Sequence, residues 1–533
     1  MKRMGTVMRI CLINPSILNE NKINSPLSTR NKYFINPYTL QHIGIAYIAS
    51  VLEANQFETD IIECGHENLG INDVCKRIEG KEYDAIGISA YFYNYTNVLR
   101  IVKNIRKKNP GIFLYLGGYL PTFLYHDVLI SIPEVNCCVV GEGEITTLEL
   151  LQKYSNGQDW RAVDGIAYLQ DQEVIFTGKR QLVSNLDDLP FPKRQFMSER
   201  RLLPVLTSRG CYGHCNYCGI YEFHKTCTGK LVRRRSSENV VAEIKELVAS
   251  YNVEYITFND GNFHISSANG RKWFHTFYSL IKEANINIKY LCDFRANEIV
   301  AAKDIVEKFV EIGLYNVNVG IESMAQSQLD FYNKTTTVEQ NIQSLKILNE
   351  LGLHYTMGIM IFNPIATVEE ILETLTVFKD IRLYEEDYNI NRPISIGSVV
   401  VATTGTPLYD YVVEQGLYAP NELNYNFKYD QTRLNYEIAS EWSNDIAVRF
   451  NKNYLYYIAE DHEMHEEIRM LRHIFSELYR VDLEFMYALS KGILSRAIQD
   501  KSDAEKIKDE WSDSMDKIDQ QLDLLESTLM QNY

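Results

Sequence analysis

Two series of alternating strand-like and helix-like segments dominate the hydrophobic pattern of the chain. In the first series, apolar runs of strand length are separated by amphipathic stretches with helical spacing. Strands are expected at Arg9–Pro15, Thr59–Cys64, Ala85–Ala90, Ile112–Gly118 and Val135–Val140, and helices at Leu40–Ala54, Ile71–Ile78 and Thr96–Asn109. Repeated βα units of this size predict a doubly wound parallel sheet whose ligand lies at the carboxyl ends of the strands.

The second series begins near residue 203 and predicts a second α/β unit. Strands are expected at Leu203–Thr207, Tyr255–Phe258, Ile288–Cys292, Asn316–Gly320, His354–Phe362 and Ile394–Ala402. Helices are expected at Glu238–Ser250, Gly270–Ala284, Ala301–Ile312, Val338–Leu351 and Thr367–Ile381. Six βα units fall short of a closed eight-fold barrel, so this series predicts a partial (β/α)6 barrel.

The remaining segments connect or follow the two series. Asp164–Ser184 predicts a small β excursion, and a proline-bearing connector follows it. Near the end of the chain, Trp511, Met515 and Leu522 belong to an apolar stripe of helical spacing, which we expect to pack on its own domain, a dimer seam being the alternative. We therefore expect an α/β protein with a Rossmann-like domain at 1–160, a linker at 161–198, the partial barrel at 199–410 and a helical C-terminal domain at 411–533.

Charge and cysteine content narrow the class of protein. The net charge of −16 argues against a nucleic-acid partner, because phosphate-binding surfaces need a basic excess. No apolar run approaches the ~20 residues of a membrane span. Asn14-Pro15 interrupts the first apolar run, which excludes a signal peptide there. Most of the ten cysteines lie in apolar segments without ligand spacing, which fits a reducing cytoplasm.

Three of the cysteines stand in one short segment after an expected strand. Cys211, Cys215 and Cys218 have the spacing C-x-x-x-C-x-x-C and follow the turn Ser208-Arg209-Gly210. Three thiolates on one tight loop can hold three irons of a cubane cluster and leave the fourth iron open. Zinc is the alternative, but structural zinc needs a fourth ligand, and the sequence contains no second C-x-x-C pair. We therefore expect a [4Fe-4S] cluster.

This segment resembles the signature of the radical S-adenosylmethionine (SAM) enzymes, with an aromatic residue, Tyr217, directly before the third cysteine. The resemblance implies that the open iron binds the amino and carboxylate groups of SAM. An electron from the cluster then splits the sulfonium bond, and the released 5′-deoxyadenosyl radical takes a hydrogen atom from the substrate. The partial barrel matches that of this family.

The same resemblance implies SAM contacts from Tyr217 and from four residues at later strand ends. Asp260 is expected to receive the SAM amino group, with Asn262 beside it, because a carboxylate suits an ammonium group. Arg295 and Glu322 resemble positions that meet the SAM carboxylate and ribose. Glu322 could equally be a charge favoured at a helix N-terminus.

Glycines and a serine end the strands of the first series. Ser89 ends the third strand, Gly117-Gly118 closes the fourth, and Gly141-Glu142-Gly143 follows the fifth. Glycines let the backbone approach a large ligand, and a serine hydroxyl can bond a buried nitrogen. Upstream of the cysteines, the arrangement resembles the Rossmann-like cobalamin-binding domain of the cobalamin-dependent radical SAM enzymes, where serine and double glycine line the slot for the dimethylbenzimidazole tail.

The sequence departs from the best-known cobalamin domains in one respect. Their D-x-H-x-x-G motif, which supplies a histidine to cobalt, is absent after the first strand. His42 is a lone histidine that we expect to be structural. The resemblance implies that Tyr91, Phe92 and Tyr93, after the third strand, face the cobalt from below. The alternative is that these aromatic residues pack the edge of the domain.

Methylation is the commonest outcome that the resemblance implies. We expect a C-methyltransferase acting on an unactivated carbon of a natural-product or peptide precursor. Its cofactors would be a [4Fe-4S] cluster, SAM and cobalamin, and its electron donor a flavodoxin or ferredoxin. A cobalamin-binding cyclase or ring-rearranging enzyme is the first alternative, and a cofactor-binding sensor without turnover is the second.

Overall fold

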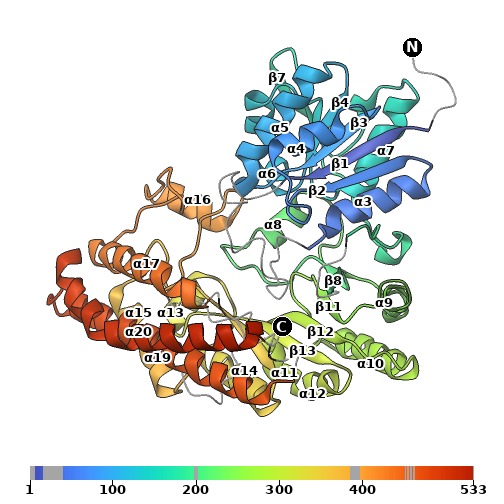
Figure 1. Cartoon of the computed structure of the whole chain (residues 1–533). Coiled ribbons are helices and arrows are strands. Elements are labelled where there is room, and N and C mark those ends of the chain that lie inside the picture. The colour runs from blue at the N-terminus through green and yellow to red at the C-terminus, as the bar shows by residue number, and fades with distance from the viewer. Residues whose placement is uncertain are drawn as a thin grey trace. The chain divides into compact units, whose positions relative to one another are not determined.

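The computed structural model describes residues 7–15, 40–196, 202–383, 397–450, 452, 455, 459 and 463–531. The chain divides into two compact units (Figure 1). Unit 1 comprises Met1–Tyr212 and Gly219–Gly261, and unit 2 comprises Gly213–Cys218 and Asn262–Tyr533. The division therefore falls within the cysteine segment and within the second series of strands.

Unit 1 is built on a mainly parallel sheet of seven strands in the order β2-β1-β3-β4-β5-β6-β7. The strands are β1 (Arg9–Asn14), β2 (Glu58–Glu63), β3 (Ala85–Ser89), β4 (Phe113–Gly117), β5 (Cys137–Val139), β6 (Ile166–Gln170) and β7 (Glu173–Phe176). β1 to β5 pair in parallel, which confirms the five predicted strands and the doubly wound sheet. β6 and β7 add an antiparallel hairpin at the edge, so part of the predicted linker belongs to the sheet.

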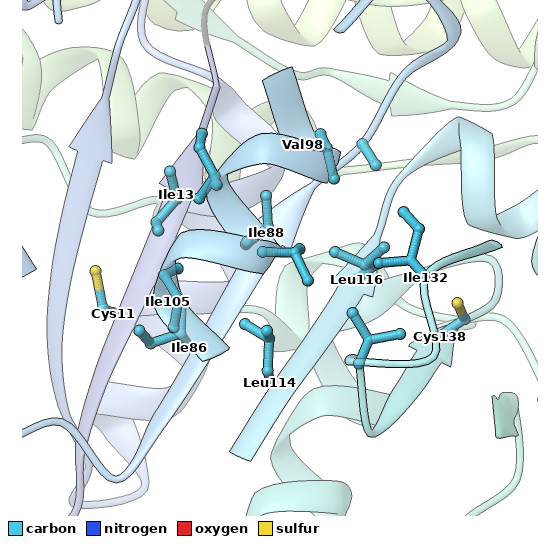
Figure 2. Packing of buried hydrophobic residues seen from close by; sticks show 14 of the residues in the cluster. Cys11, Ile13, Ile86, Ile88, Val98, Ile105, Leu114, Leu116, Ile132 and Cys138 are labelled. Carbon is cyan, nitrogen blue, oxygen red and sulfur yellow. The ribbon is translucent and has the colours of Figure 1, made fainter. Parts of the chain in front are cut away.

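Helices cover both faces of this sheet. They are α3 (Ile43–Ala54), α4 (Ile71–Ile78), α5 (Tyr95–Lys108), α6 (Tyr119–Ser131) and α7 (Gly143–Ser155). Buried residues of α4, α5 and α6 pack with one face, where Ile86 and Ile88 of β3 meet Val98 and Ile105 of α5 (Figure 2). Buried residues of α3 and α7 pack with the opposite face. Because β1 lies between β2 and β3, the strand order reverses between β1 and β3, which is where such sheets bind ligands.

The second series of strands is also parallel. In unit 1, β8 (Leu202–Val205) pairs with β11 (Tyr255–Phe258). In unit 2, β12 (Lys289–Arg295), β13 (Leu314–Glu322) and β14 (His354–Ile359) pair in that order. These confirm five of the six predicted strands. The sixth, Ile394–Ala402, begins outside the described residues, and its described part forms an isolated bridge between Val399 and Phe362.

The five predicted helices of the second series are present. They are α9 (Ser237–Tyr251) in unit 1 and α10 (Ala268–Glu283), α12 (Lys303–Glu311), α14 (Val338–Glu350) and α15 (Val368–Asp380) in unit 2. Two short helices that were not predicted, α11 (Ala296–Ala301) and α13 (Gln326–Phe331), also lie in unit 2. Ser and Thr residues cap several of them; Thr337 and Thr367, for example, each accept a bond from a backbone N–H of the first turn.

The C-terminal region is helical, as predicted. It consists of α16 (Pro407–Glu414), α17 (Asp430–Phe450), α19 (His465–Leu494) and α20 (Lys501–Gln531). α19 lies against α15, α17 and α20 (Figure 1). Met515, Ile518 and Leu522 of the predicted stripe are buried, so the stripe packs on its own domain. Within the described ranges, no helix is long and apolar enough to cross a membrane.

Candidate active site

The cysteine segment connects β9 (Ser208–Arg209) to α8 (Gly219–Lys225). Cys215 is buried, with 8% of its surface exposed, and the backbone N–H of Cys218 donates to the Cys215 carbonyl over 3.1 Å. The described residues contain no group of three or more His, Cys, Asp or Glu side chains placed to hold a metal ion together. A cubane does not need such convergence, because each cysteine binds a different iron. A set of three cysteine thiolates would fit a cluster with one open iron.

Arg295, at the end of β12, contacts the cysteine segment. Its Nη1 donates to Sγ of Cys215 over 3.2 Å, and its Nη2 donates to Oγ1 of Thr335 over 3.0 Å. The backbone N–H of Arg295 donates to Oδ1 of Asn262 over 3.0 Å. Parallel strands deliver their carboxyl ends to one edge, which is why residues predicted separately meet here. The contact places the positive charge of the guanidinium beside the Cys215 sulfur.

A buried ion pair lies at the end of β13. Nζ of Lys334 is 2.6 Å from Oε1 of Glu322. Gly320 makes room for this pair, because a Cβ there would stand 2.6 Å from Nζ of Lys334. Glu322 has a positive φ of 63° and lies at an irregularity in the pairing of β13 with β14. The bulge re-aims the Glu322 side chain.

Tyr217 joins this ion pair to the cysteine segment. Its hydroxyl hydrogen-bonds Glu322, and burial together with the charges of Glu322 and Cys215 holds the pKa of Tyr217 well above its ordinary value. The phenol therefore stays protonated and donates to the carboxylate. Unit 2 thus brings together four of the five residues that the sequence predicts for SAM: Tyr217, Asn262, Arg295 and Glu322.

Two polar atoms beside these residues are buried and have no hydrogen-bond partner among the residues that the structure describes. They are Nδ2 of Asn262, a residue that is 5% exposed, and Oγ1 of Thr336, which follows Thr335 in the chain. A buried amide without a partner is costly, so a ligand that supplies an acceptor would be bound favourably. The amide donor, the guanidinium and the carboxylate–ammonium pair fit a ligand that carries both an ammonium and a carboxylate, as SAM does.

Asp260 is in unit 1, and its described contacts are to its own unit. Its Oδ1 accepts from the backbone N–H groups of Thr207 (2.7 Å) and Ser208 (3.1 Å), and its Oδ2 accepts from their hydroxyls. Burial raises the pKa of Asp260 above its ordinary value, and these hydrogen bonds oppose that shift. The carboxylate braces the turn that leads to Cys211. Its contact with the SAM amino group stays a prediction.

A cavity of about 320 Å³ opens at the carboxyl edge of the parallel sheet in unit 1. Its lining includes seven residues of the predicted cobalamin site, namely Ser89, Tyr91, Gly117, Gly118, Glu142, Gly141 and Gly143. Gly118 has a φ of 100°, and a Cβ there would stand 2.8 Å from the Ala90 carbonyl oxygen, so only glycine fits. The bare backbone at these strand ends leaves a space that suits a large flat ligand such as a corrin.

Phe92 and Tyr93 are not part of this lining. The short 3-10 turn Phe92–Asn94 directs Phe92 to the core on the α5 side of the sheet. Tyr93 is exposed and stacks on Tyr91, with ring centroids 5.1 Å apart. Contact of Phe92 and Tyr93 with a corrinoid stays a prediction.

His42 caps α3 and lines the same cavity. Its Nδ1 accepts from the backbone N–H of Ile45 over 3.1 Å, and its Nε2 lies 2.5 Å from the Tyr91 hydroxyl. Burial lowers the pKa of His42 to about 4, so the ring is neutral and its Nε2–H donates to Tyr91. His42 is structural, as expected, and it also fixes the orientation of Tyr91.

Charged residues form a buried network at another wall of the cavity. Arg233 donates from both Nη atoms to Glu142, over 2.9 and 2.7 Å, and Nη2 of Arg209 donates to Glu144 over 2.6 Å. Burial alone would raise the pKa of Glu142. The hydrogen bond from Arg233 and the charge of Arg209 outweigh this effect and lower the pKa below its ordinary value. Because Arg209 lies just before Cys211 in the chain, this network fixes the start of the cysteine segment to the cavity wall.

Sequence reasoning missed Lys334, Arg209 and Tyr115, the last of which also lines the cavity of unit 1. Lys334 lies in the loop after α13, ten elements along the chain from the cysteine segment, and no motif marks it. Arg209 directly precedes Gly210 in the turn before the cysteines, and its charge next to an expected ligand loop was a usable signal. Tyr115 lies inside β4, where an aromatic residue predicts core.

Comparisons with known proteins agree on two domain families. The B12 binding domain family matches residues 37–151, and the Radical SAM superfamily matches residues 205–378. An uncharacterised methyltransferase of Pyrococcus horikoshii is 28% identical over 70% of this chain and 79% of that protein. The anaerobic magnesium-protoporphyrin IX monomethyl ester cyclase of Rubrivivax gelatinosus is 28% identical over 63% of this chain and 61% of that protein.

A solved structure has the same fold over almost the whole chain. It is the cobalamin-dependent S-adenosylmethionine radical enzyme OxsB with aqua-cobalamin bound, which superposes with a TM-score of 0.72 and covers 99% of this chain and 80% of its own. The sequence identity is 17%, so the likeness shows a shared fold. The helical C-terminal region is part of this likeness.

Proposed function

The chain belongs to the cobalamin-dependent radical SAM enzymes, and we propose that it is a C-methyltransferase acting on an unactivated carbon of a natural-product or peptide precursor. The observation that carries the proposal is the cavity of unit 1, whose lining includes Ser89 and the glycines at the ends of β4 and β5. Two relatives named above bear on the reaction. The one named a methyltransferase shares more of its length with this chain than the cyclase does.

When bound, the cluster with SAM supplies hydrogen-atom abstraction, and the corrinoid supplies the methyl group. The residues of this chain hold and orient these groups. Cys211, Cys215 and Cys218 would each hold one iron, and Arg295 would place its positive charge beside the Cys215 ligand. The Glu322–Lys334 pair offers one charge of each sign to the amino and carboxylate ends of SAM.

The residues of unit 1 would position the corrinoid and exclude water from it. The glycines at the strand ends let the corrin lie close to the backbone. Tyr91, fixed by neutral His42, presents a protonated phenol to the cavity, because burial raises the pKa of Tyr91 above its ordinary value. Both ring nitrogens of His42 are engaged in hydrogen bonds, so His42 would serve to hold Tyr91 in place beside the bound corrinoid.

Enzymes with a radical SAM domain use small-molecule substrates and a reductant, and we propose a flavodoxin or ferredoxin as the electron donor. We propose the cytoplasm as the compartment. Buried free thiols such as Cys137 and Cys138, together with an oxygen-sensitive cluster, favour a reducing environment.

The test is anaerobic reconstitution of the full chain with iron, sulfide and cobalamin, followed by incubation with SAM, a reductant and candidate precursors. Methylation consumes SAM in two ways, so we expect S-adenosylhomocysteine and 5′-deoxyadenosine together, with a product heavier by one methyl group. 5′-Deoxyadenosine without S-adenosylhomocysteine would point to the cyclase alternative. Bound cofactors without reductant-dependent 5′-deoxyadenosine would point to a sensor.

A matched variant separates the cluster from the corrinoid. Replacing Cys211, Cys215 and Cys218 by alanine removes the proposed iron ligands, and none of the three is among the residues that line the cavity of unit 1. We expect this variant to lose the brown absorption and 5′-deoxyadenosine formation while it still binds the corrinoid. Retention of metal as zinc in the unchanged chain would contradict the proposal.

A further inference from the structure

The floor of the cavity in unit 1 lies deeper in the sheet than the strand-end residues that were predicted to line the site. In the sheet, Leu12 of β1 pairs with Gly87 of β3, and Gly87 pairs with Tyr115 of β4. Ser89 pairs with Gly117 in the row two residues nearer the carboxyl edge, which is about 7 Å away along the strands. All five residues line the cavity, so it extends from the strand ends down to Tyr115.

The Tyr115 ring reaches across the neighbouring strand at this floor. A Cβ on Gly87 would stand 2.5 Å from both Cζ and Oη of Tyr115, so the ring tip covers the place where a side chain of β3 would be. Tyr115 is 4% exposed, and its hydroxyl is buried without a hydrogen-bond partner in the described structure. Burial holds the pKa of Tyr115 above its ordinary value, so the hydroxyl is a neutral donor and acceptor.

Two residues of α7 that line the same cavity each have a buried polar atom for which the described part of the chain provides no hydrogen-bond partner. The atoms are Oγ1 of Thr147, a residue that is 1% exposed, and Oε2 of Glu144, whose other oxygen binds Arg209. Apolar side chains also line the cavity, among them Ile45, Ile48 and Val139. A buried hydroxyl without a partner is costly, and phenylalanine or valine would fill the same space without that cost. The polar atoms therefore indicate a ligand with polar groups at this depth.

We propose that the corrinoid bound in this cavity carries a hydrogen-bonding lower base, a purine such as adenine, in place of dimethylbenzimidazole. The inference rests on the proposed function, namely that the cavity receives a corrinoid with its nucleotide tail toward the floor. The far edge of dimethylbenzimidazole carries two methyl groups, which would leave the Tyr115 and Thr147 hydroxyls without partners. The corresponding edge of adenine carries ring nitrogens and an amino group, which can accept from and donate to hydroxyls.

The experiment compares two complete cobamides, one with adenine and one with dimethylbenzimidazole as the lower base. Each is titrated into the corrinoid-free full chain, and binding is followed by quenching of tryptophan fluorescence. We expect the adenine form to bind about tenfold more tightly, the ratio that one satisfied buried hydrogen bond supplies. Equal affinities, or tighter binding of the dimethylbenzimidazole form, would overturn the proposal.

Single substitutions test whether the floor of the cavity causes the preference for the adenine form. Tyr115→Phe and Thr147→Val are each expected to weaken binding of the adenine form by several-fold and to leave the other form unchanged. Tyr290→Phe makes the same chemical change in the buried core of unit 2 and should leave both affinities unchanged. A preference that survives in both cavity variants would also overturn the proposal. If neither cobamide binds the unchanged chain, the proposed function itself fails, which is a distinct outcome.

Discussion

Nη1 of Arg295 lies 3.2 Å from Sγ of Cys215, although eighty positions separate the two residues in the sequence. The contact places a permanent positive charge next to one of the proposed cluster ligands. It also links a residue predicted to bind SAM with a residue predicted to bind iron.

Replacing Arg295 by glutamine is expected to slow reductive cleavage of SAM by about 10- to 100-fold, because a charge-assisted hydrogen bond contributes about 1.5–3 kcal/mol. The measurement is the rate of 5′-deoxyadenosine formation, together with the electron paramagnetic resonance spectrum of the reduced cluster with and without SAM. Arg295→Lys keeps the charge and should lose less. An unchanged spectrum and rate in Arg295→Gln would show that the contact does not act on the cluster.

The Glu322–Lys334 pair predicts an energetic coupling within unit 2. Both side chains are buried, so Lys334→Met should leave an uncompensated carboxylate and cost about 3–5 kcal/mol in the free energy of unfolding. The double variant Glu322→Gln with Lys334→Met should recover part of this loss. Urea denaturation of the four proteins gives the coupling energy. Additive losses would mean that the two charges do not stabilise each other.

Substitution of Gly118 tests whether the cavity requires a residue without a Cβ at this position, and Gly157 serves as a matched control. Gly118→Ala combines an unfavourable positive φ with a Cβ 2.8 Å from the Ala90 carbonyl oxygen. Gly157→Ala has a similar backbone strain, at φ 67°, but its Cβ would meet nothing within 4 Å. We expect Gly157→Ala to lower the free energy of unfolding by about 1 kcal/mol and to bind corrinoid normally. Gly118→Ala should lose more stability and should lose corrinoid binding measured by equilibrium dialysis.

Glu63 predicts a pH dependence of stability. Burial raises the pKa of Glu63 from 4.5 to about 7, while hydrogen bonds from Asn14 and from the backbone of His42 oppose the shift. Because the pKa of the folded state is the higher one, its stabilising contribution is fully present below pH 4.5. That contribution is lost as the pH rises through about 7.

The matched variant is Glu63→Gln, which keeps the size of the side chain and removes its titration. Between pH 5 and pH 8 the unchanged chain should lose up to about 3 kcal/mol of unfolding free energy relative to this variant. His42 titrates in both proteins and cancels in the comparison. Parallel stability curves in urea denaturation at these two pH values would contradict the assignment.

The sequence predicted the strands and helices well because their signals are local. Ile71–Ile78 was placed with its observed bounds, and the glycines at the ends of β4 and β5 were found because a strand end is visible as a change in pattern. The side chains of the site were harder to predict. Lys334 meets Glu322 only because a bulge in β13 turns the carboxylate toward it, and Tyr115 reaches the cavity only because β3 carries a glycine beside it. Both depend on long-range register, which hydrophobic periodicity does not encode.

The antiparallel hairpin of β6 and β7 has a practical consequence for anyone who expresses the N-terminal part alone. A fragment that ends at residue 160 would lack β6, the strand that pairs with β5. β5 would then be an exposed edge strand, which is prone to self-association. The same fragment would also uncover α3, on which Leu186 and Leu189 pack. A fragment that continues through residue 196 keeps both the β6–β7 hairpin and the packing of Leu186 and Leu189 on α3. We therefore expect the fragment that ends at residue 196 to stay monomeric.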